Sequence, residues 1–314
     1  MPETAELREV ATGLSFPEGP VMLPDGDLLF TEMVTGMLKR VPAGGGEVTV
    51  VASMGGSANG AAIGPDGRVY VANSGGWSWT RLGEMYLPGN HAGTRADDYI
   101  GGRIQVVDLE NGSVEDLYIE CDGRPLRAPN DLVFDAEGGF WFTDHGHVHD
   151  GVRDVGAVYY ALPDGSSIVE VIRAADAPNG IGLSPDGGRL YVAETQTSRV
   201  WWWDLAAPGR LANDAPFFGN GGTLLAGLPG HQLFDSLAID GDGYVCVATI
   251  VNGGITAISP DGASVQHAAL PDPIVTNICF GGDDFRTAYA TLSGNGAIVA
   301  FEWPRPGLAL AHQR

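Results

Sequence analysis

One pattern recurs six times along the chain and limits the folds open to it. Each copy has a short apolar run, a turn built on Asp-Gly or a close variant, and a second apolar run. The copies are PEGPVMLPDGDLLFTE, ANGAAIGPDGRVYVAN, PNDLVFDAEGGFWFTD, PNGIGLSPDGGRLYVAE, FDSLAIDGDGYVCVAT and TNICFGGDDFRTAYAT. Short β-branched or aromatic runs on either side of such a turn predict two antiparallel strands.

The spacing of the copies predicts the architecture. Four of the five steps between neighbouring copies are 41 to 56 residues long, and the longer step, from the second to the third, contains an insertion. Repeats of roughly 40 to 50 residues with several strands each are typical of β-propellers. We therefore expect an all-β fold, a six-bladed β-propeller, with residues 1–314 in a single domain. Residues 6–14, ELREVATGL, are expected to add the outermost strand to the last blade.

A polar residue stands at the same place in every copy. Seven positions before the acidic residue of the turn there is always a carboxylate or a carboxamide: Glu18, Asn59, Asn130, Asn179, Asp235 and Asn277. Because the innermost strands of a propeller line its central channel, these six side chains are expected to form a ring at one end of it. They either hold a ligand or cap the inner strands by bonding to backbone groups.

Four members of this ring offer a cation only oxygen atoms: Glu18, Asn130, Asn179 and Asp235. Hard divalent cations, Ca²⁺ above all, prefer carboxylate and amide oxygens. Two carboxylates that face each other in a narrow channel repel one another when no cation lies between them. The ring therefore predicts one divalent metal ion in the central channel. Ca²⁺ is the first expectation, with Mn²⁺, Fe²⁺ and Zn²⁺ as alternatives that an oxygen-rich site accepts.

Composition narrows the class of function. A net charge of −22 opposes binding to nucleic acid and to anionic membrane surfaces. Lys39 is the single lysine, which argues against a P-loop and against Schiff-base catalysis. No apolar run approaches the roughly 20 residues of a membrane helix, and the start, MPETAELREV, lacks the features of a signal peptide. We expect a cytoplasmic protein that acts on a small molecule, and the sequence leaves the oligomeric state open.

Four motifs that occur in order carry a resemblance to a known family. They are PEGP at Pro17, PNDL at Pro129, PNG at Pro178 and FDSLAID at Phe234. Through them, and over nearly its whole length, the chain resembles the SMP-30/gluconolactonase/LRE-like family. The resemblance implies a six-bladed propeller with a divalent metal, usually calcium, in the channel. It also implies hydrolysis of sugar lactones, which many members carry out.

The resemblance further implies roles for individual ring residues. Glu18, Asn179 and Asp235 are implied to be metal ligands, and Asn130 is either a fourth ligand or a contact to substrate and metal-bound water. The base or nucleophile is implied to be Asp235. The ring contains no histidine, so a carboxylate is the natural proton acceptor there, and Glu18 is the competing one.

Further side chains are expected around the substrate. Asn59 lies in a blade that supplies no ligand in the family pattern. Arg127 lies three residues before Asn130, whereas some lactonases of the family have an arginine two residues before it, so Arg127 either contacts substrate or packs at the surface. His145, in DHGHVHDG, either contacts substrate or lies in a solvated loop.

A long loop from Trp77 to Arg103 follows the second strand of blade two and should emerge beside the ring. Long loops in compact folds are usually functional or disordered, and the aromatic residues here argue against disorder. This insertion, at about residues 77–103, is expected to be a lid or pocket wall over the metal face that brings Trp77 to the substrate. A contact between subunits is the alternative.

These expectations combine into one leading function. It is a metal-dependent hydrolase that opens a small polar lactone, as a gluconolactonase does. Hydrolysis of organophosphates, such as phosphotriesters or fluorophosphates, at the same site is a second possibility. A metal-stabilised binding propeller without catalysis is the third, because one propeller scaffold can host either kind of function.

Overall fold

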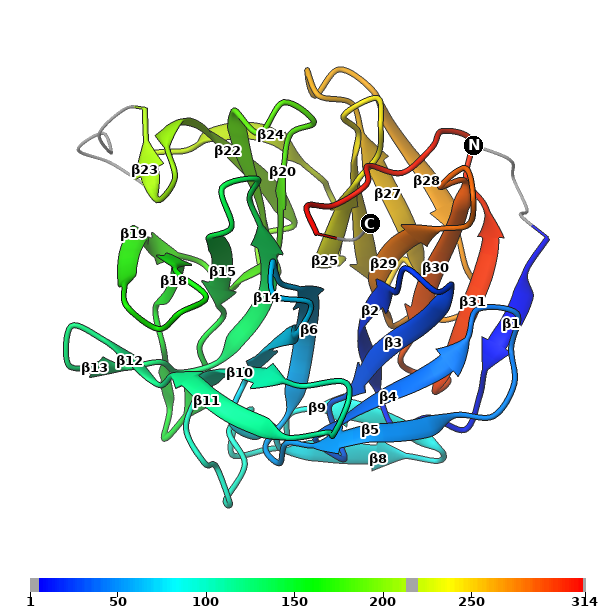
Figure 1. Ribbon diagram of the computed structural model, residues 1–314, viewed down its shortest axis with the longest axis horizontal. Helices are drawn as coiled ribbons and strands as arrows, with labels where there is room; N and C mark the ends of the chain where they lie inside the picture. The colour runs from blue at the N-terminus through cyan, green and yellow to red at the C-terminus, as the bar shows by residue number, and fades with distance from the viewer. Residues whose placement is uncertain (1–5, 213–219, 313–314) are drawn as a thin grey trace.

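The computed structural model describes residues 6–212 and 220–312, and every regular element in these residues is a β-strand. Six sheets stand around a central channel (Figure 1). Five of them have four strands and the fourth sheet along the chain has five. The predicted all-β, six-bladed propeller is therefore confirmed. No helix that could span a membrane occurs in the described part of the chain.

The first three blades follow one another along the chain, each built from its inner strand outward. Blade one consists of β2 (Pro17–Met22), β3 (Asp27–Glu32), β4 (Met37–Pro42) and β5 (Thr49–Ser53). Blade two consists of β6 (Ala58–Ile63), β7 (Val69–Asn73), β10 (Arg103–Val107) and β11 (Val114–Tyr118). Blade three consists of β14 (Pro129–Phe134), β15 (Phe140–Asp144), β18 (Gly156–Ala161) and β19 (Ile168–Ala175).

The other three blades complete the circle. Blade four consists of β20 (Pro178–Leu183), β21 (Arg189–Glu194), β22 (Arg199–Ala207), β23 (Arg210–Leu211) and β24 (Thr223–Gly227). Blade five consists of β25 (Leu233–Ile239), β26 (Val245–Ile250), β27 (Gly254–Ile258) and β28 (Val265–Ala269). Blade six consists of β29 (Val275–Gly281), β30 (Thr287–Leu292), β31 (Ala297–Glu302) and β1 (Arg8–Ala11).

Three small hairpins project from the blades. They are β8 (Trp79–Leu82) with β9 (Met85–Pro88), β12 (Glu120–Cys121) with β13 (Arg124–Pro125), and β16 (Val148–His149) with β17 (Val152–Arg153). The first of them lies in the long insertion of blade two. The third lies in the loop that follows the second strand of blade three.

The turn between the first two strands of a blade explains the recurrent Asp-Gly. In blade one, Asp25 Oδ1 accepts a hydrogen bond of 3.1 Å from the Asp27 N–H. Gly26 between them has a φ of 88°, which side chains of L-residues rarely adopt, although a Cβ at this position would meet no atom within 4 Å. Backbone conformation, and not crowding, therefore selects glycine in this turn.

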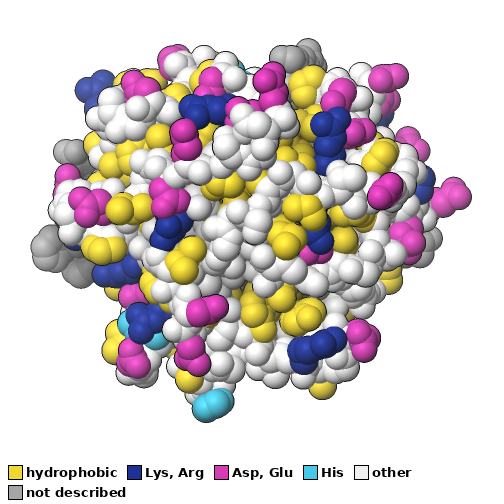
Figure 2. Space-filling model, turned by 60° about the horizontal axis from the view of Figure 1, so that its bottom comes forward, with side chains coloured by type: hydrophobic (Ala, Val, Ile, Leu, Met, Phe, Trp, Pro, Cys, Tyr) yellow, Lys and Arg dark blue, Asp and Glu magenta, His cyan; other side chains and the backbone are white. Residues whose placement is uncertain are grey.

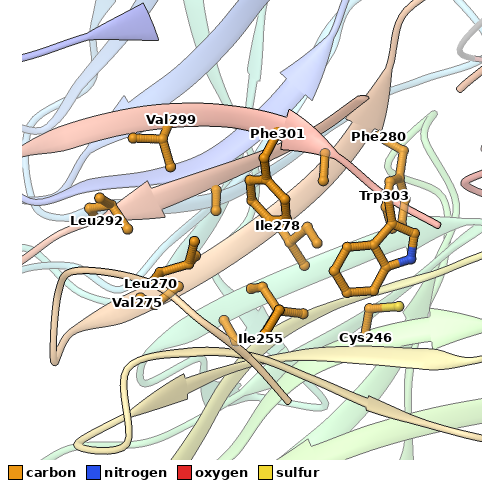
Figure 3. Close-up of a cluster of buried hydrophobic side chains, with 14 of the residues drawn as sticks. Cys246, Ile255, Leu270, Val275, Ile278, Phe280, Leu292, Val299, Phe301 and Trp303 are labelled. Atoms are coloured by element: carbon orange, nitrogen blue, oxygen red, sulfur yellow. The ribbon is translucent and has the colours of Figure 1, made fainter. Parts of the chain in front are cut away.

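Hydrophobic clusters fill the spaces between neighbouring blades. Between blades five and six, Phe280, Phe301 and Trp303 pack against Cys246 and Ile255 (Figure 3). Similar clusters occupy the other five junctions. Each sheet is thus buried on both faces, which explains why the strand segments read as nearly continuous apolar runs.

The ends of the chain meet in blade six. Strand β1 pairs antiparallel with β31, with Arg8 opposite Ala300, so the predicted outer strand from residues 6–14 is confirmed. A hydrogen bond of 2.6 Å from Ser293 Oγ to the Pro17 carbonyl also joins blade six to blade one. On the surface, Figure 2 shows acidic side chains scattered between arginines and hydrophobic groups, with no continuous basic patch on that face.

Candidate metal centre

A recurring irregularity of the inner strands positions the ring residues. In every blade, the register between the inner strand and its partner shifts at the ring position. Such bulges re-aim side chains that a regular strand would direct elsewhere. All six ring side chains are buried, and none is more than 9% exposed: Glu18, Asn59, Asn130, Asn179, Asp235 and Asn277.

Threonine hydroxyls connect the ring from blade to blade. Thr31 Oγ1 in blade one donates a hydrogen bond of 2.7 Å to the carbonyl of Asn59 in blade two. Thr143 Oγ1 in blade three donates one of the same length to the carbonyl of Asn179 in blade four. These bonds fix the backbone of a ring residue to the preceding blade, so neighbouring members of the ring cannot move independently.

Some ring side chains are already engaged by other protein groups. Glu18 Oε2 accepts hydrogen bonds of 2.9 Å from the Gly19 N–H and from Asn277 Nδ2. Asn179 Nδ2 donates to Thr195 Oγ1 at 3.1 Å, and Asn179 Oδ1 accepts from Ser236 Oγ at 3.3 Å. Both side chains are therefore held in fixed orientations.

The two ring carboxyls are strained electrostatically. Burial raises the pKa of Glu18, and hydrogen bonds from Asn277 and Gly19 oppose the rise. Burial raises the pKa of Asp235 well above its usual value, the negative charge of Glu18 adds to the effect, and a hydrogen bond from Asn179 opposes it. A cation between them would relieve both the desolvation of the carboxylates and their mutual repulsion.

Other polar atoms at the same end of the channel have no partner. Asn59 Oδ1, Asn130 Oδ1 and the indole N–H of Trp77 are buried without a hydrogen bond. Buried polar atoms in proteins are nearly always bonded, so such a group of exceptions calls for a ligand. Two carboxylates together with partnerless amide oxygens fit a hard divalent cation.

The donor set is poor in the usual charged ligands. Within residues 6–212 and 220–312, no group of three or more His, Cys, Asp or Glu side chains is arranged to hold a metal ion. An ion in the ring would therefore depend on amide oxygens as much as on carboxylates. That is the mixed shell expected from the sequence.

A third carboxyl in the channel was not predicted. Asp131 is buried, and burial together with the charge of Glu18 raises its pKa to about 7, against the effect of a hydrogen bond from the Leu132 N–H. Regular strand alternation would direct Asp131 away from the side that Asn130 faces. The acidic residue inside the apolar run PNDLVF was the only sequence signal for it.

Asp131 faces a cavity on the turn side of the ring. The cavity has a volume of about 700 Å³ and occupies the channel between the ring and the turns of the blades. Asp131 and Asn277 line it, apolar side chains such as Ile181 and Leu237 surround it, and residues 308–312 of the C-terminal segment border it. Figure 1 shows this segment in red across the middle of the molecule.

Two of the predicted substrate contacts lie together beside the ring. The rings of Trp77 and His145 have centroids 5.6 Å apart. The backbone N–H of Trp77 donates to Ser57 Oγ, two residues before Asn59. The backbone N–H of His145 donates to the Ala128 carbonyl, two residues before Asn130.

His145 is a neutral imidazole near neutral pH. Burial lowers the pKa of His145 to about 4, against the effect of a hydrogen bond with the Gly146 carbonyl. In that 2.9 Å bond, His145 Nδ1 faces a carbonyl, which can only accept. This assigns the proton to Nδ1 and leaves Nε2 as an acceptor.

Arg127 is oriented differently from the other predicted contacts. Its guanidinium is half-exposed and lies 3.6 Å from Asp154 Oδ1, which is its ion-pair partner. Its backbone N–H donates to Asp144 Oδ2, and its carbonyl accepts from the Tyr99 hydroxyl. The backbone of Arg127 thus supports the loop before β14, while its side chain lies at the rim with Asp154.

The fold and the ring define a class of protein: a six-bladed propeller with a buried, oxygen-lined centre in its channel. A model of the SMP-30/Gluconolactonase/LRE-like region matches residues 16–294. The chain therefore belongs to the SMP-30/gluconolactonase/LRE-like family, as its motifs predicted.

Relatives of known type agree at modest identity. The chain is 27% identical to a gluconolactonase of Zymomonas mobilis over 321 residues, which cover 92% of this chain and 79% of the relative. It is 32% identical to the lactonase drp35 of Staphylococcus saprophyticus over 170 residues, 54% of this chain and only half of the relative. It is 30% identical to the diisopropyl-fluorophosphatase of Loligo vulgaris over 200 residues, 60% of this chain and 61% of the relative.

A solved structure supports the fold. The calcium-binding protein regucalcin of Agrobacterium tumefaciens superposes with a TM-score of 0.72 over 98% of each chain, at 18% identity. At that identity the likeness concerns the fold alone. Together the relatives support a lactonase-type hydrolase at the level of the family.

Proposed function

We propose that this protein is a metal-dependent lactone hydrolase whose centre is the ring. One observation carries the proposal: two buried carboxylates share a ring with amide oxygens that have no partner inside the protein. Such a centre fits a hard cation and an ester better than it fits a purely structural role, which would leave no polar atom unbonded.

Four ring residues would hold the ion. Glu18, Asn179 and Asp235 are the proposed ligands, with Asn130 as the fourth, and Ca²⁺ is the first candidate because every donor is an oxygen. When bound, a divalent ion supplies Lewis-acid polarisation of an ester carbonyl. The hydrogen bonds that Glu18 accepts from Asn277 and that Asn179 donates to Thr195 set these two side chains in place before an ion arrives.

Asp235 is the proposed proton acceptor. Its carboxylate would take the proton of the water that attacks the ester carbonyl, as a general base does. Burial and the charge of Glu18 raise the pKa of Asp235, which strengthens it as a base, and the Asn179 amide orients it. An ion bound nearby would lower that pKa again, so the base is a moderate one.

Groups on blades two and three would orient the lactone. Asn59 Oδ1 and the Trp77 indole N–H are buried and partnerless, and they are available as an acceptor and a donor. His145 adds a neutral acceptor at Nε2 beside Trp77. Arg127, half-exposed at the rim, is the outermost of the proposed contacts.

A small polar lactone of the sugar type is the first substrate to test, because a gluconolactonase is matched over 92% of this chain. The test is chelation of the purified protein, measurement of its metal content, and a lactone panel after restoring Ca²⁺, Mn²⁺, Fe²⁺ or Zn²⁺ singly. We expect turnover that requires the added metal. A folded, metal-loaded protein that opens no lactone would contradict the proposal and favour a binding propeller.

A second candidate function is hydrolysis of organophosphates. The observation that favours it is the identity of 30% to a diisopropyl-fluorophosphatase over 60% of this chain. A divalent ion held by the same ligands would polarise a phosphoryl oxygen as well as a carbonyl oxygen. Fluoride release from a dialkyl fluorophosphate by the metal-loaded protein, faster than lactone opening, would make this the principal activity.

A further inference from the structure

A buried histidine lies where the insertion of blade two, at residues 77–103, meets blade three. It is His147, which precedes β16 and is 1% exposed. His147 Nε2 lies 3.0 Å from the carbonyl oxygen of Ser74, which can only accept, so the proton is assigned to Nε2. Nδ1 is then an acceptor, and Thr94 Oγ1 donates to it at 3.2 Å. Both nitrogens of a neutral imidazole are thus bonded inside the protein.

The insertion is attached to blade three around this histidine. Thr94 Oγ1 accepts a hydrogen bond of 2.9 Å from the Val148 N–H, and the Thr94 N–H donates to the Val148 carbonyl at 2.8 Å. The ring of Tyr99 meets His147 edge-on, with 5.3 Å between the ring centroids. The Tyr99 hydroxyl donates to the Arg127 carbonyl, in the loop before β14. His147 therefore contacts two residues of the insertion that are themselves bonded to blade three or to the loop before it.

The indole of Trp77, at the start of the insertion, lies against the same histidine. The Trp77 ring has its centroid 5.2 Å from that of His147 and 5.6 Å from that of His145. The indole also packs against a buried apolar cluster at the ring end of blades one and six: Phe16, Met33 and Ile274. The side chain thus reaches from blade three toward the opposite side of the channel.

Packing, and not hydrogen bonding, sets the orientation of this indole. The backbone N–H of Trp77 donates to Ser57 Oγ, which fixes the main chain to blade two but leaves the side-chain torsions undetermined. The indole N–H is buried and has no partner in the protein. The direction of this N–H therefore depends on the rings beside it. A smaller side chain at position 147 would leave a space into which the indole could turn.

We propose that His147 is a positioning residue of the hydrolysis: it holds the insertion on blade three and so directs the Trp77 indole N–H toward an oxygen of the lactone. The inference rests on the proposed function, because it requires Trp77 to bind the substrate. His147 contacts neither the ion nor the lactone, since it is buried and both of its nitrogens are engaged. His145 differs from it in having Nε2 left as an acceptor.

Variants at position 147 separate its contacts. Glutamine can place an amide nitrogen near the position of Nε2, so His147→Gln keeps a donor for Ser74. Asparagine can place an amide oxygen near the position of Nδ1, so His147→Asn keeps an acceptor for Thr94. His147→Ala removes both bonds and the ring beside Trp77. His91→Ala is the matched control, because His91 is an exposed histidine of the same insertion.

Hydrogen exchange measured by mass spectrometry tests the attachment without any substrate. In His147→Ala we expect the amides of residues 77–99 to exchange roughly tenfold faster than in the wild-type protein, while the inner strands of the blades keep their protection. Thr94→Val breaks the bond to Nδ1 from the side of the insertion and should give a smaller change of the same kind. His91→Ala should leave the exchange unchanged.

A double-mutant cycle on metal-loaded protein, with glucono-δ-lactone as the substrate, tests the link to Trp77. Trp77→Phe removes the indole N–H and should raise KM roughly fivefold. His147→Ala should raise KM by a similar factor with Ca²⁺ affinity unchanged, and His147→Gln should restore part of the loss. Combined with Trp77→Phe, His147→Ala should add little, because both changes remove the same contact to the substrate.

The outcomes separate this inference from the proposed function. Wild-type exchange of residues 77–99 in both His147→Ala and Thr94→Val would overturn the role of His147, whether or not a lactone is opened. Lactone opening in which the effects of His147→Ala and Trp77→Phe on KM multiply would overturn the link between them and leave lactone hydrolysis standing. Folded, metal-loaded protein that opens no lactone would overturn the proposed function together with this refinement.

Discussion

The two sides of the ring are built on opposite plans. On blades one, four and five, Glu18, Asn179 and Asp235 are tied to neighbours such as Asn277 and Ser236. On blades two and three, Asn59 and Asn130 each have an amide oxygen without a partner. The first side carries both ring carboxylates and is held in place by the protein, while the second is neutral and incompletely bonded.

The two sides of the ring therefore differ in what they are suited to bind. Ligands that are fixed in advance lose little freedom when an ion binds, so the tied side suits the ion. On the other side, the partnerless oxygen of Asn130 is free to complete the shell of the ion, and that of Asn59 suits a substrate that arrives and leaves.

Asp131 is a carboxyl on the otherwise neutral side of the ring, and the pH dependence of stability tests whether it is protonated there. Burial raises the pKa of Asp131 to about 7, so the folded protein keeps a proton that the unfolded chain releases above pH 4 or so. The metal-free protein should therefore lose stability as pH rises from about 4 to about 7. Between pH 5 and pH 8, the loss of this proton alone would lower the free energy of unfolding by about 3 kcal/mol.

Urea unfolding in the presence of a chelator measures this effect. Asp131→Asn is the comparison variant, and its stability should vary less over the same range of pH. A curve for the wild-type protein that is flat from pH 5 to pH 8 would show that Asp131 is not a buried, protonated group.

Asp235→Asn should cause the largest loss of activity. An amide oxygen remains for the ion, but the proton acceptor is lost, and turnover should fall roughly 100-fold or more. Turnover must be measured at saturating metal and divided by measured occupancy. A corrected value within a few-fold of wild type would make Asp235 a ligand only, and His145 would become the better base.

Glu18→Gln should weaken metal binding more than any other change in the ring. It removes one of the two carboxylates of the ring and nearly preserves the shape, so we expect affinity to fall roughly 30-fold. Asn277→Ala, which removes only the hydrogen bond to Glu18, should have a smaller effect. Titration calorimetry with Ca²⁺ measures both, and equal losses would mean that orientation matters as much as charge.

Asn59→Ala should have the smallest effect and should fall on the substrate alone. Loss of one hydrogen-bonding group corresponds to about 1 kcal/mol, so KM should rise roughly fivefold with metal affinity unchanged. Steady-state kinetics and a parallel metal titration separate the two quantities. A large loss of metal would show that Asn59 belongs to the ion-binding side.

Much of the fold could be predicted from the sequence because each blade repeats the same local pattern. The Asp-Gly turns have a local cause, the positive φ of residues such as Gly26, and the apolar runs reflect sheets buried on both faces. The ring followed from their register. All six residues that the register selected are buried at the second or third position of an inner strand.

Other features depend on contacts that no local pattern carries. Asp131 escaped notice because a bulge, invisible in the sequence, alters which side chains face the channel. The packing of Trp79 on Phe16 and of Met85 near Gly294 joins segments of three blades. The roles assigned to Asn130, Asp235, Arg127 and the other site residues stay predictions.

The junction between blades one and six has a consequence for how the protein is made. Glu18 receives its hydrogen bond from Asn277, 259 residues later in the chain, and β1 waits for β31 to pair with it. During synthesis from the N-terminus, the first blade therefore emerges with an open edge, and its ring carboxylate lacks the Asn277 hydrogen bond until the last blade appears. The centre matures only at the final step of assembly. An ion captured at that moment would stabilise the closed ring of blades. Its removal should loosen the junction between blades one and six before any other part of the fold.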